Sequence, residues 1–204
     1  MIMKYIVFGM TKSSFFFLAF LLCYATPAVS QYKPEREHRI RPSQFPELGI
    51  QFIENSLKDV RKLKYYRETD SSGIRFGIRF RKDRLHYLAC FDEEGNIIYL
   101  GFIIKKVDIP GEAFSNMKAS LARQFSRFRI RSMEQQYVLT PGETLEQLIH
   151  DAFQNLLLPA IRYRVVVRGR INRHFRDFAA QFDYEGRLIE IHPALPVNYD
   201  HVLY

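Results

Sequence analysis

Two pairs of carboxylates stand in the same short pattern and are the first residues that could do chemistry. The stretch Phe-Asp-Glu-Glu-Gly at 91–95 returns as Phe-Asp-Tyr-Glu-Gly at 182–186. An aspartate and a glutamate two residues later could act as general acid and base if the fold placed both in a cleft. The same pattern, Asp-x-x-Gly between two apolar runs, is typical of a hairpin turn whose glycine takes a positive φ. We interpret all four carboxylates as turn residues rather than catalytic ones.

The remaining residue types offer little other chemistry. The six histidines form neither a His-x-x-x-His pair nor a His-Glu-x-x-His motif, and these are the common zinc-binding patterns. The sequence also lacks a glycine-rich phosphate loop and a Gly-x-Ser-x-Gly nucleophile motif. We therefore predict no catalytic residue, no cofactor and no metal, and a protein that is not an enzyme.

Cys90 is the one thiol left to consider, because the only other cysteine, Cys23, lies in the N-terminal segment. A reactive thiol needs an accessible and electropositive setting, and arginines do lie nearby in the sequence. The apolar pattern around Cys90 favours an inert cysteine on a strand.

Arginines that alternate with apolar residues are the strongest binding signal. In 74–80 and in 163–170, apolar residues occupy one set of alternate positions and arginines occupy much of the other. Such alternation places the arginines on the sheet face away from the core. A solvated face explains this pattern as well, and a nucleic-acid surface is disfavoured by the secretory signal described below. The candidate binding residues are Arg75, Arg79, Leu88, Tyr99, Arg164, Arg168 and Arg170.

The elements that hold these residues follow from periodicity. Residues 74–100 align without a gap to 165–191 and share a period-two apolar pattern around the shared turn. Helical spacing of apolar residues predicts helices from Ser43 to about Leu57, from Pro110 to about Phe125, and over 141–158. The last of these starts with Thr140-Pro141-Gly142-Glu143, a capping-box pattern. Strands are predicted at 61–68, 74–81, 85–91, 96–105, 127–139, 161–170, 174–183 and 187–192.

The order of elements predicts an α+β fold built twice. Each unit would be a helix and four antiparallel strands, with the helices packed on one sheet face and an extra helix, 141–158, inserted in the second unit. The first unit would span 43–108 and the second 109–193. A flexible lead-in is predicted at 31–42 and a C-terminal tail at 194–204.

Residues 1–30 have the pattern of a secretory signal peptide. Lys4 and Lys12 precede an apolar run at 15–23, and Ala28-Val29-Ser30 supplies the small residues of a cleavage site after Ser30. An uncleaved anchor helix and a lipoprotein attached at Cys23 are the alternatives. The formal net charge of +8 falls to +6 when the two lysines are removed. We expect the protein in the periplasm or outside the cell.

The hairpin unit resembles PepSY-like domains of secreted bacterial proteins, which are also described as β-lactamase-inhibitor-protein-like. The residues that carry the resemblance are 87–98 with the exit Val107-Asp108-Ile109-Pro110, and the related stretch 178–189. The resemblance implies a tandem α+β fold, export, and binding of a protein or peptide rather than catalysis. The inserted helix and the strongly basic strands depart from the family pattern, so the resemblance implies no particular partner.

These observations together predict a secreted or periplasmic, non-catalytic module that binds a protein or peptide with an acidic surface, with inhibition as one form of such binding. The alternative is a structural envelope protein that associates with itself through its sheet face. No nucleic acid is expected as a partner, and no transmembrane segment is expected after signal cleavage.

Overall fold

The computed structural model describes residues 36–70 and 73–194. The contacts divide the chain into 1–33 and 34–204, and every described residue belongs to the second unit. The predicted signal peptide, Cys23 and most of the predicted tail lie outside the described residues. The buried core cluster runs from Ile40 to Phe182, so the second unit contains the whole of it.

The described strands form one antiparallel sheet of nine strands in which each strand pairs with the next along the chain. The helices are α2 (Glu47–Ser56), α3 (Gly111–Gln124) and α4 (Leu145–Phe153), with short 3-10 turns at Pro42–Gln44 and Lys106–Asp108. The strands are β1 (Arg36–Ile40), β2 (Arg61–Asp70), β3 (Gly73–Lys82), β4 (Leu85–Phe91), β5 (Ile97–Ile104), β6 (Phe128–Val138), β7 (Arg162–Ile171), β8 (His174–Asp183) and β9 (Leu188–Pro193).

The predicted division into two helix-plus-four-strand units is wrong. Strand β5 pairs with β6 from Tyr99 opposite Val138 to Ile104 opposite Met133. This pairing joins the two predicted sheets into one, and the buried residues on both sides of it belong to a single hydrophobic cluster.

The predicted lead-in, residues 31–42, contains a strand that the sequence did not predict. Strand β1 pairs with β2 from Arg36 opposite Thr69 to Ile40 opposite Tyr65. Its sequence, Arg-Glu-His-Arg-Ile, is too polar to show the alternation by which strands are recognised. The polar composition of β1 follows from its position at the edge of the sheet. An edge strand buries little apolar surface, and charged side chains on it discourage pairing with other chains.

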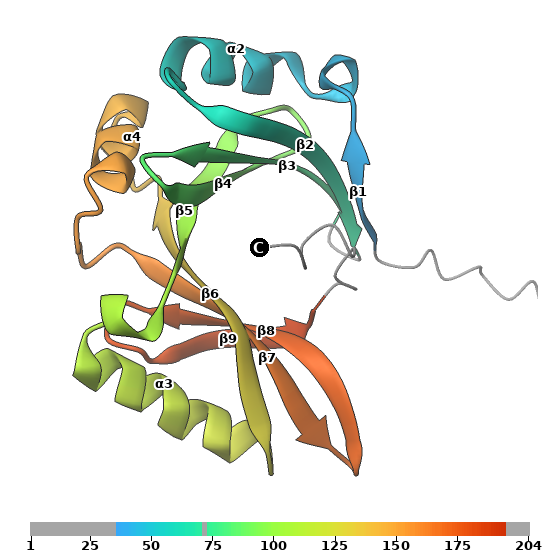
Figure 1. The fold of residues 1–204 in the computed structure, drawn as a ribbon, viewed down its shortest axis with the longest axis vertical. Helices are drawn as coiled ribbons and strands as arrows, with labels where there is room; N and C mark the ends of the chain where they lie inside the picture. Colours follow the sequence, from blue (N-terminus) through green and yellow to red (C-terminus); the bar gives the residue numbers. More distant parts are fainter. Residues whose placement is uncertain (1–35, 71–72, 195–204) are drawn as a thin grey trace, which may run out of the picture. The chain divides into compact units, whose positions relative to one another are not determined.

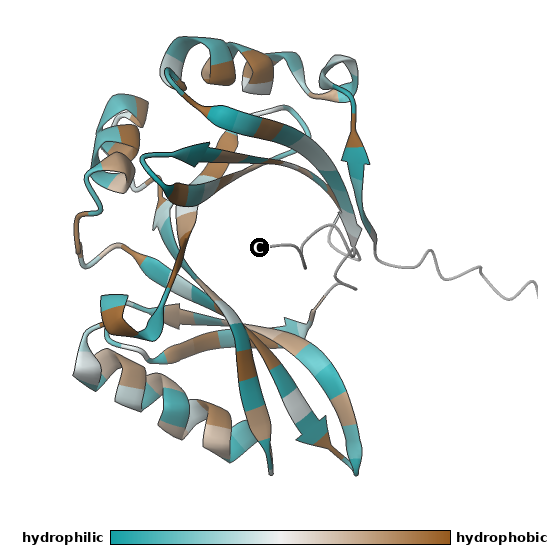
Figure 2. Cartoon of the chain, viewed as in Figure 1, coloured by the Kyte–Doolittle hydropathy of each residue, from teal (hydrophilic) through white to brown (hydrophobic). Residues whose placement is uncertain are grey.

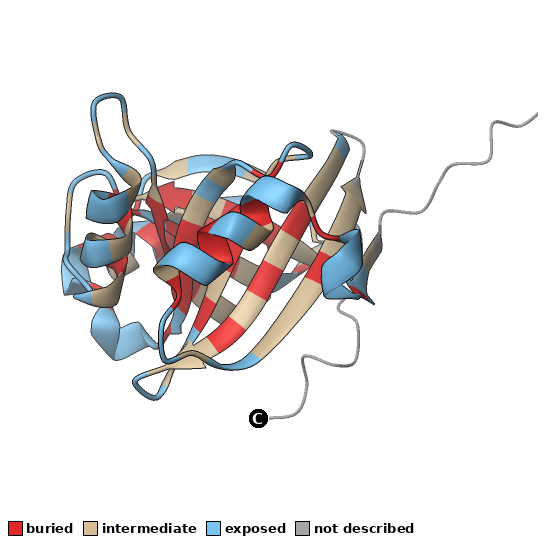
Figure 3. Cartoon of the chain, turned by 90° about the horizontal axis from the view of Figure 1, so that it is seen from above, coloured by how far each residue is buried: buried red, intermediate tan, exposed pale blue. Residues whose placement is uncertain are grey.

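Alternation along the strands decides which sheet face is the core. On β3, Phe76, Ile78 and Phe80 are buried while the residues between them are half-buried. Figure 2 shows the hydrophilic and hydrophobic positions alternating along the strands, and Figure 3 shows buried bands on strands beneath a helix. All three helices lie on this outer face, and the sheet curls so that its opposite face lines the inside of the curve (Figure 1).

Helix α4 is real but shorter than predicted and begins at another residue. The Thr140–Glu143 hydrogen bonds form as expected, but Gly142 has a φ of 87°, which a helix does not accommodate. The helix starts instead after Thr144, whose side chain accepts from the backbone N–H of Gln147 while Gln147 accepts from Thr144. The sequence contains two consecutive capping-box patterns, Thr140–Glu143 and Thr144–Gln147. The second of them caps the helix.

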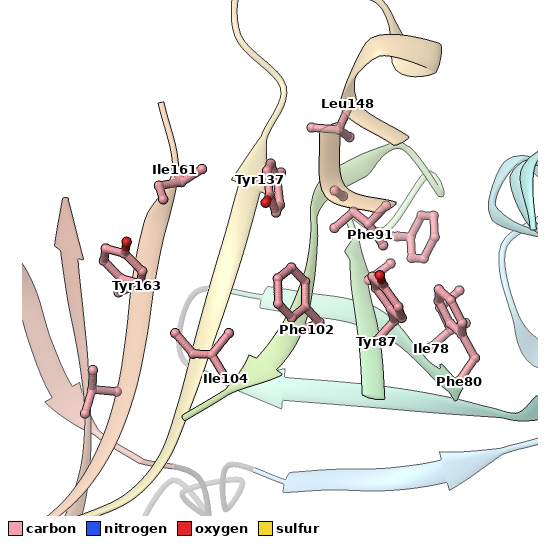
Figure 4. Packing of buried hydrophobic residues seen from close by; sticks show 14 of the residues in the cluster. Ile78, Phe80, Tyr87, Phe91, Phe102, Ile104, Tyr137, Leu148, Ile161 and Tyr163 are labelled. Carbon is pink, nitrogen blue, oxygen red and sulfur yellow. The ribbon is translucent and has the colours of Figure 1, made fainter. Parts of the chain in front are cut away.

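Helix α4 covers the β5–β6 junction. Its Leu148 and Ala152 are buried against the sheet, and Phe153 meets Tyr87 of β4 edge-on with ring centroids 5.2 Å apart. Figure 4 shows Leu148 above the side chains of Tyr137, Phe102 and Tyr87, which come from three neighbouring strands. One helix therefore packs on strands from both predicted units.

Hydrogen bonds fix the end of α4 to β6. The Tyr137 hydroxyl donates to the carbonyl of Leu156 over 2.9 Å. The Nε2 group of the buried Gln135 lies 2.6 Å from the Tyr137 hydroxyl and 3.3 Å from Asn155 Oδ1. A buried amide is costly unless it finds partners, so these bonds explain how a glutamine is accommodated in the core under α4.

Gly101 permits the close approach of β5 and β6. A Cβ atom at this position would lie 2.5 Å from the carbonyl oxygen of Gln135 and 3.3 Å from the Cα of Gln136. Both contacts are with backbone of the neighbouring strand, so a side-chain rotation could not relieve them. Gly101 pairs with Gln136 at this junction, and any other residue would force the strands apart.

The two Asp-x-x-Gly turns are confirmed as turns and have the same structure. In the first turn, Asp92 Oδ1 accepts from the N–H of Asn96 over 2.7 Å, and in the second, Asp183 Oδ1 accepts from the N–H of Arg187 over 2.8 Å.

Each turn packs on the third residue of a helix. A Cβ at Gly95 would lie 2.8 Å from the nitrogen of Gly49, and one at Gly186 would lie 2.1 Å from the carbonyl oxygen of Ala113.

We predict that Gly101→Ala lowers the free energy of unfolding by about 1–3 kcal/mol, the usual cost of overpacking. Urea denaturation followed by circular dichroism measures this. Gly111→Ala is the matched control, because no atom lies within 4 Å of a Cβ there, and it should change stability by less than about 1 kcal/mol. Equal effects of the two substitutions would contradict the role assigned to the β5–β6 junction.

We also predict an acid-sensitive turn at Asp92. Burial acts to raise the pKa of Asp92, but hydrogen bonds from Asn96 and from the backbone outweigh it, and the pKa lies below its ordinary value of 3.8. A lowered folded pKa stabilises the fold above the unfolded pKa, and this stabilisation disappears as the pH falls through the folded pKa. Asp92→Asn should therefore be less stable than wild type at neutral pH.

The stability gap between wild type and Asp92→Asn should shrink as the pH falls below about 4. Thermal unfolding across a pH series measures it. Glu93→Gln, an exposed position in the same turn, is the control and should remain close to wild type throughout. A gap of constant size at every pH would refute the electrostatic origin of the Asp92 effect.

Candidate functional site

The inner face of the sheet carries most of the chemically interesting side chains. Strand pairing places Tyr66, Gly77, Cys90 and Tyr99 in one row across β2 to β5. A second row runs Arg79, Leu88, Gly101, Gln136 and Arg162 across β3 to β7. Because paired residues share a face, these rows form one surface, which we call the inner face.

A polar network centred on Arg164 lies on this face across β6, β7 and β8. Arg164 Nη1 donates to Glu134 Oε1 over 3.1 Å. Gln136 Nε2 donates to Glu134 Oε2 over 3.3 Å, and Gln181 Nε2 donates to Gln136 Oε1 over 2.9 Å. Glu134 and Gln136 are only 7% and 2% exposed. We call these four residues the Arg164 cluster.

The surroundings of Arg164 show that the curl brings distant strands into electrostatic reach. The carboxylate of Glu134 raises the pKa of Arg164, burial opposes this, and Tyr99, Glu68 and Glu37 add to the rise. Glu37 and Glu68 stand on β1 and β2, whereas Arg164 stands on β7. Opposite charges act over such separations only when water is partly excluded between them.

Arg79 is held in place on the other side of the inner face. Its guanidinium forms an ion pair with Glu37 of β1 and lies 4.2 Å from the centre of the Tyr66 ring. A guanidinium over an aromatic face gains cation–π attraction in addition to the ion pair. Both contacts cross strands, so they fix the direction in which Arg79 points. Arg75 pairs with Glu68 in the β2–β3 register.

Tyr99 and Cys90 lie between these two arginine sites and are chemically quiet. Burial, followed by the charges of Cys90 and Glu134, raises the pKa of Tyr99 well above its ordinary value. Burial is also the main cause that raises the pKa of Cys90 to about 12, although Arg75 and Arg164 act to lower it. Cys90 is 7% exposed, which agrees with the interpretation of an inert strand cysteine.

Arg168 and Arg170 belong to a separate group. They follow Arg164 along β7 by four and six residues, which corresponds to about 13 and 20 Å of strand. Their guanidinium carbons lie 6.0 and 5.9 Å from the ring centre of Phe175 on β8. The structure thus brings Arg75, Arg79, Leu88, Tyr99 and Arg164 onto one part of the inner face and leaves these two arginines near the end of a hairpin.

The acidic and amide partners on the inner face were not predicted from the sequence. Glu134 and Gln136 are buried within β6, and Glu37 lies on the unrecognised strand β1. The signal available for the first two was the run Glu-Gln-Gln at 134–136 inside a strand with apolar neighbours. Successive side chains of a strand point to opposite faces of the sheet, so consecutive polar residues place a polar side chain on each face.

Other kinds of site find little support in the described residues. Within residues 36–70 and 73–194, no group of three or more His, Cys, Asp or Glu side chains could hold a metal ion. No helix in the same ranges is long and apolar enough to cross a membrane. An open hollow of about 480 Å³ lies on the outer face, between α3 and the β8–β9 turn, and Asn116, Ser120, Arg123 and Arg187 are among its lining residues.

Comparison with known proteins assigns no family. No family profile and no curated protein match the chain. A presumed periplasmic protein from Bacteroides eggerthii is 9% identical, with 74% of this chain and 90% of the other covered and a TM-score of 0.46.

Two further solved structures are also presumed periplasmic proteins. One, of the DUF2874 family from Bacteroides vulgatus, is 14% identical with a TM-score of 0.30. The other, described as calcium-regulated and from Bacteroides thetaiotaomicron, is 17% identical with a TM-score of 0.29. Each covers 76% of this chain and 96% of its own. With all three TM-scores below 0.5, we draw no conclusion on fold family or function, and the resemblance to PepSY-like domains stays a prediction.

We predict that Cys90 resists thiol reagents in the folded protein. Raising the pKa from 9.0 to about 12 reduces the thiolate fraction near pH 8 by about a thousandfold. The measurement is the rate of reaction with a chromogenic disulfide in buffer and in denaturant, with Cys23→Ser so that Cys90 is the only thiol. A native rate within about tenfold of the denatured rate would show that the thiol is accessible and would contradict the prediction.

Proposed function

We propose that the protein is an exported, non-catalytic module that binds an acidic segment of a protein partner on its inner face. The observation that carries this proposal is the pair of arginines, Arg79 and Arg164, held in fixed positions on a concave surface by carboxylates from other strands. Export is supported by the secretory pattern of residues 1–30.

Preorganisation is what suits these arginines to binding. A guanidinium has five N–H donors in a planar fork and can serve more than one carboxylate. Arg164 donates Nη1 to Glu134, so a ligand carboxylate could be met by its other donors. A side chain already fixed in the free protein loses less conformational entropy on binding than a mobile one.

The neighbours of these arginines have the composition of a protein-binding surface. Tyr99 and Leu88 are half-buried and supply an aromatic and an aliphatic side chain on the same face. Ile103 is 41% exposed although it lies in the middle of the sheet. Arginine and tyrosine with a few aliphatic residues are typical of interface hot spots. A peptide in extended form would fit along a curved sheet without rearranging it.

We predict that a photo-crosslinker at position 88 captures a partner and that one at position 107 does not. Leu88 lies on the inner face, and Val107, which is 85% exposed, lies on the loop before α3. The two full-length variants would be expressed in the source cell, irradiated and compared by mass spectrometry. Capture at position 107 alone would refute the assignment to the inner face, and crosslinks between two copies at position 88 would favour self-association.

The charge requirement can be tested with a defined probe. Fluorescein-labelled oligoglutamate should bind the protein, and its affinity should fall as salt is added. The paired variant Arg164→Gln with Glu134→Gln removes both charges and so avoids an unpaired buried carboxylate. It should weaken binding roughly tenfold, whereas Arg123→Gln, on helix α3, should leave the affinity unchanged. A loss of affinity in Arg123→Gln with none in the paired variant, whose net charge equals that of the parent chain, would show that binding follows net charge and not this site.

A further inference from the structure

A second basic feature lies at the ends of β6, β7 and β8, away from the Arg164 cluster. Arg127 immediately precedes β6 and Arg129 is its second residue. Arg168 and Arg170 lie at the end of β7, and Arg173 and Arg176 lie at the β7–β8 turn and the start of β8. The N–H of Arg170 donates to the carbonyl of Arg127 over 2.8 Å, so these strand ends lie side by side. We call the six arginines, with Ile171 and Phe175, the arginine tip.

The tip is a rigid turn that faces solvent. Ile171 pairs with His174, which leaves Asn172 and Arg173 as a two-residue loop with φ values of 49° and 70°. Two consecutive left-handed residues are typical of a type I′ turn, the turn that best fits the twist of a hairpin. All six residues from Ile171 to Arg176 are exposed. The tip lies at the lower end of the view in Figure 1.

The arginines of the tip are not neutralised by carboxylates. Within the described part of the chain, none of the six forms an ion pair. The stretches 126–131 and 168–177 contain one acidic residue, Asp177, and it lies opposite Arg168 without forming an ion pair. This differs from Arg79 and Arg164, which are both paired. An unneutralised cluster attracts anions from a distance.

Large apolar side chains stand among these charges. Phe175 is 48% exposed and Ile171 is 41% exposed. The Phe175 ring has the guanidinium groups of Arg168 and Arg170 at 6.0 and 5.9 Å from its centre. Exposed apolar side chains do not stabilise the protein in water. Their transfer to an apolar phase is favourable, and the arginines can bring them to such a phase at an anionic surface.

We infer that the arginine tip docks end-on to an anionic lipid surface. Arg170 and Phe175 share one face of the β7–β8 hairpin, and Ile171 and Arg176 lie on the other. A protein or peptide that binds along one sheet face would contact only half of this set. A flat surface met by the end of the hairpin contacts both faces together.

The chemistry of each residue type fits a lipid headgroup layer. Guanidinium groups bind phosphate oxygens through paired hydrogen bonds. Each arginine near an anionic surface adds a similar amount to the free energy of binding. Phe175 and Ile171 would pass below the phosphates into the boundary of the acyl chains. The type I′ turn keeps them at the apex, so docking requires no refolding of the hairpin.

A vesicle-binding experiment with a matched pair of variants tests the charge requirement. Arg173 and Arg84 are both exposed second residues of two-residue turns, with φ values of 70° and 67°. Residues 34–204, which contain the whole buried core cluster, would be floated with vesicles of phosphatidylglycerol and phosphatidylcholine. Arg173→Glu should weaken binding roughly thirtyfold, because reversal changes two charges near the surface, and Arg84→Glu should bind within about threefold of the parent chain.

Insertion of the tip can be followed separately. The chain has no tryptophan, so Phe175→Trp creates a single fluorescent reporter at the apex and Val107→Trp creates one at a distant exposed position. On anionic vesicles the emission of the residue-175 reporter should shift to shorter wavelength and be quenched by brominated acyl chains, while that of the residue-107 reporter should not change. On vesicles of phosphatidylcholine alone, neither should change.

Four results would overturn the inference. Equal binding to anionic and neutral vesicles would remove the role of charge. Equal weakening by Arg173→Glu and Arg84→Glu would assign binding to net charge. An unshifted reporter at position 175 on vesicles that do bind would exclude insertion. Displacement from vesicles by a single-stranded oligonucleotide at equal phosphate concentration would assign the tip to nucleic acid, since arginines beside an aromatic ring also stack on bases.

Discussion

The pairing of β5 with β6 beneath α4 is the constraint on which the rest of the structure depends. Two sheets that each end at this junction would have unpaired edges and separate cores. Gly101 lets the two backbones approach, and α4 covers the junction with Leu148 and Ala152. The carbonyl of Leu156 and the side chain of Asn155 then fasten the end of α4 to β6. One sheet, one core and one curved inner face follow from this arrangement.

The curl also explains why a charged inner face is compatible with a stable fold. Burying Arg164 or Glu134 alone would be costly, but each neutralises the other and Gln136 and Gln181 complete the hydrogen bonding. In a flat sheet, Glu37 and Glu68 would be far from β7. Curvature brings them close enough to raise the pKa of Arg164 further. The inner face is therefore held in shape by polar contacts, whereas the outer face is held by apolar packing.

The sequence predicted the strands well and their assembly poorly, for a physical reason. Period-two alternation places β4 at 85–91 and β8 at 174–183, as observed, and the other recognised strands within two residues at each end. Alternation reports which face of a strand is buried but not which strand lies beside it. The β5–β6 pairing depends on Gly101 and on a helix forty residues later, and neither leaves a periodic signal. The arginines were found because they alternate, and their partner Glu37 was missed because β1 does not.

Arginine serves two physical purposes in this fold, and ion pairing separates them. Arg79 and Arg164 are paired with carboxylates and fixed in direction, so they favour a ligand of matching shape over one that merely carries charge. Within the described residues, the arginines of the arginine tip form no ion pair, and all of them except Arg170 are exposed, so they attract any dense anionic surface with little demand for shape. Alternation along β7 supplies both kinds from one strand. The ion pair with Glu134 fixes Arg164, whereas Arg168, further along the same strand, is exposed, so the same residue type can support selective recognition at one end of a strand and surface attraction at the other.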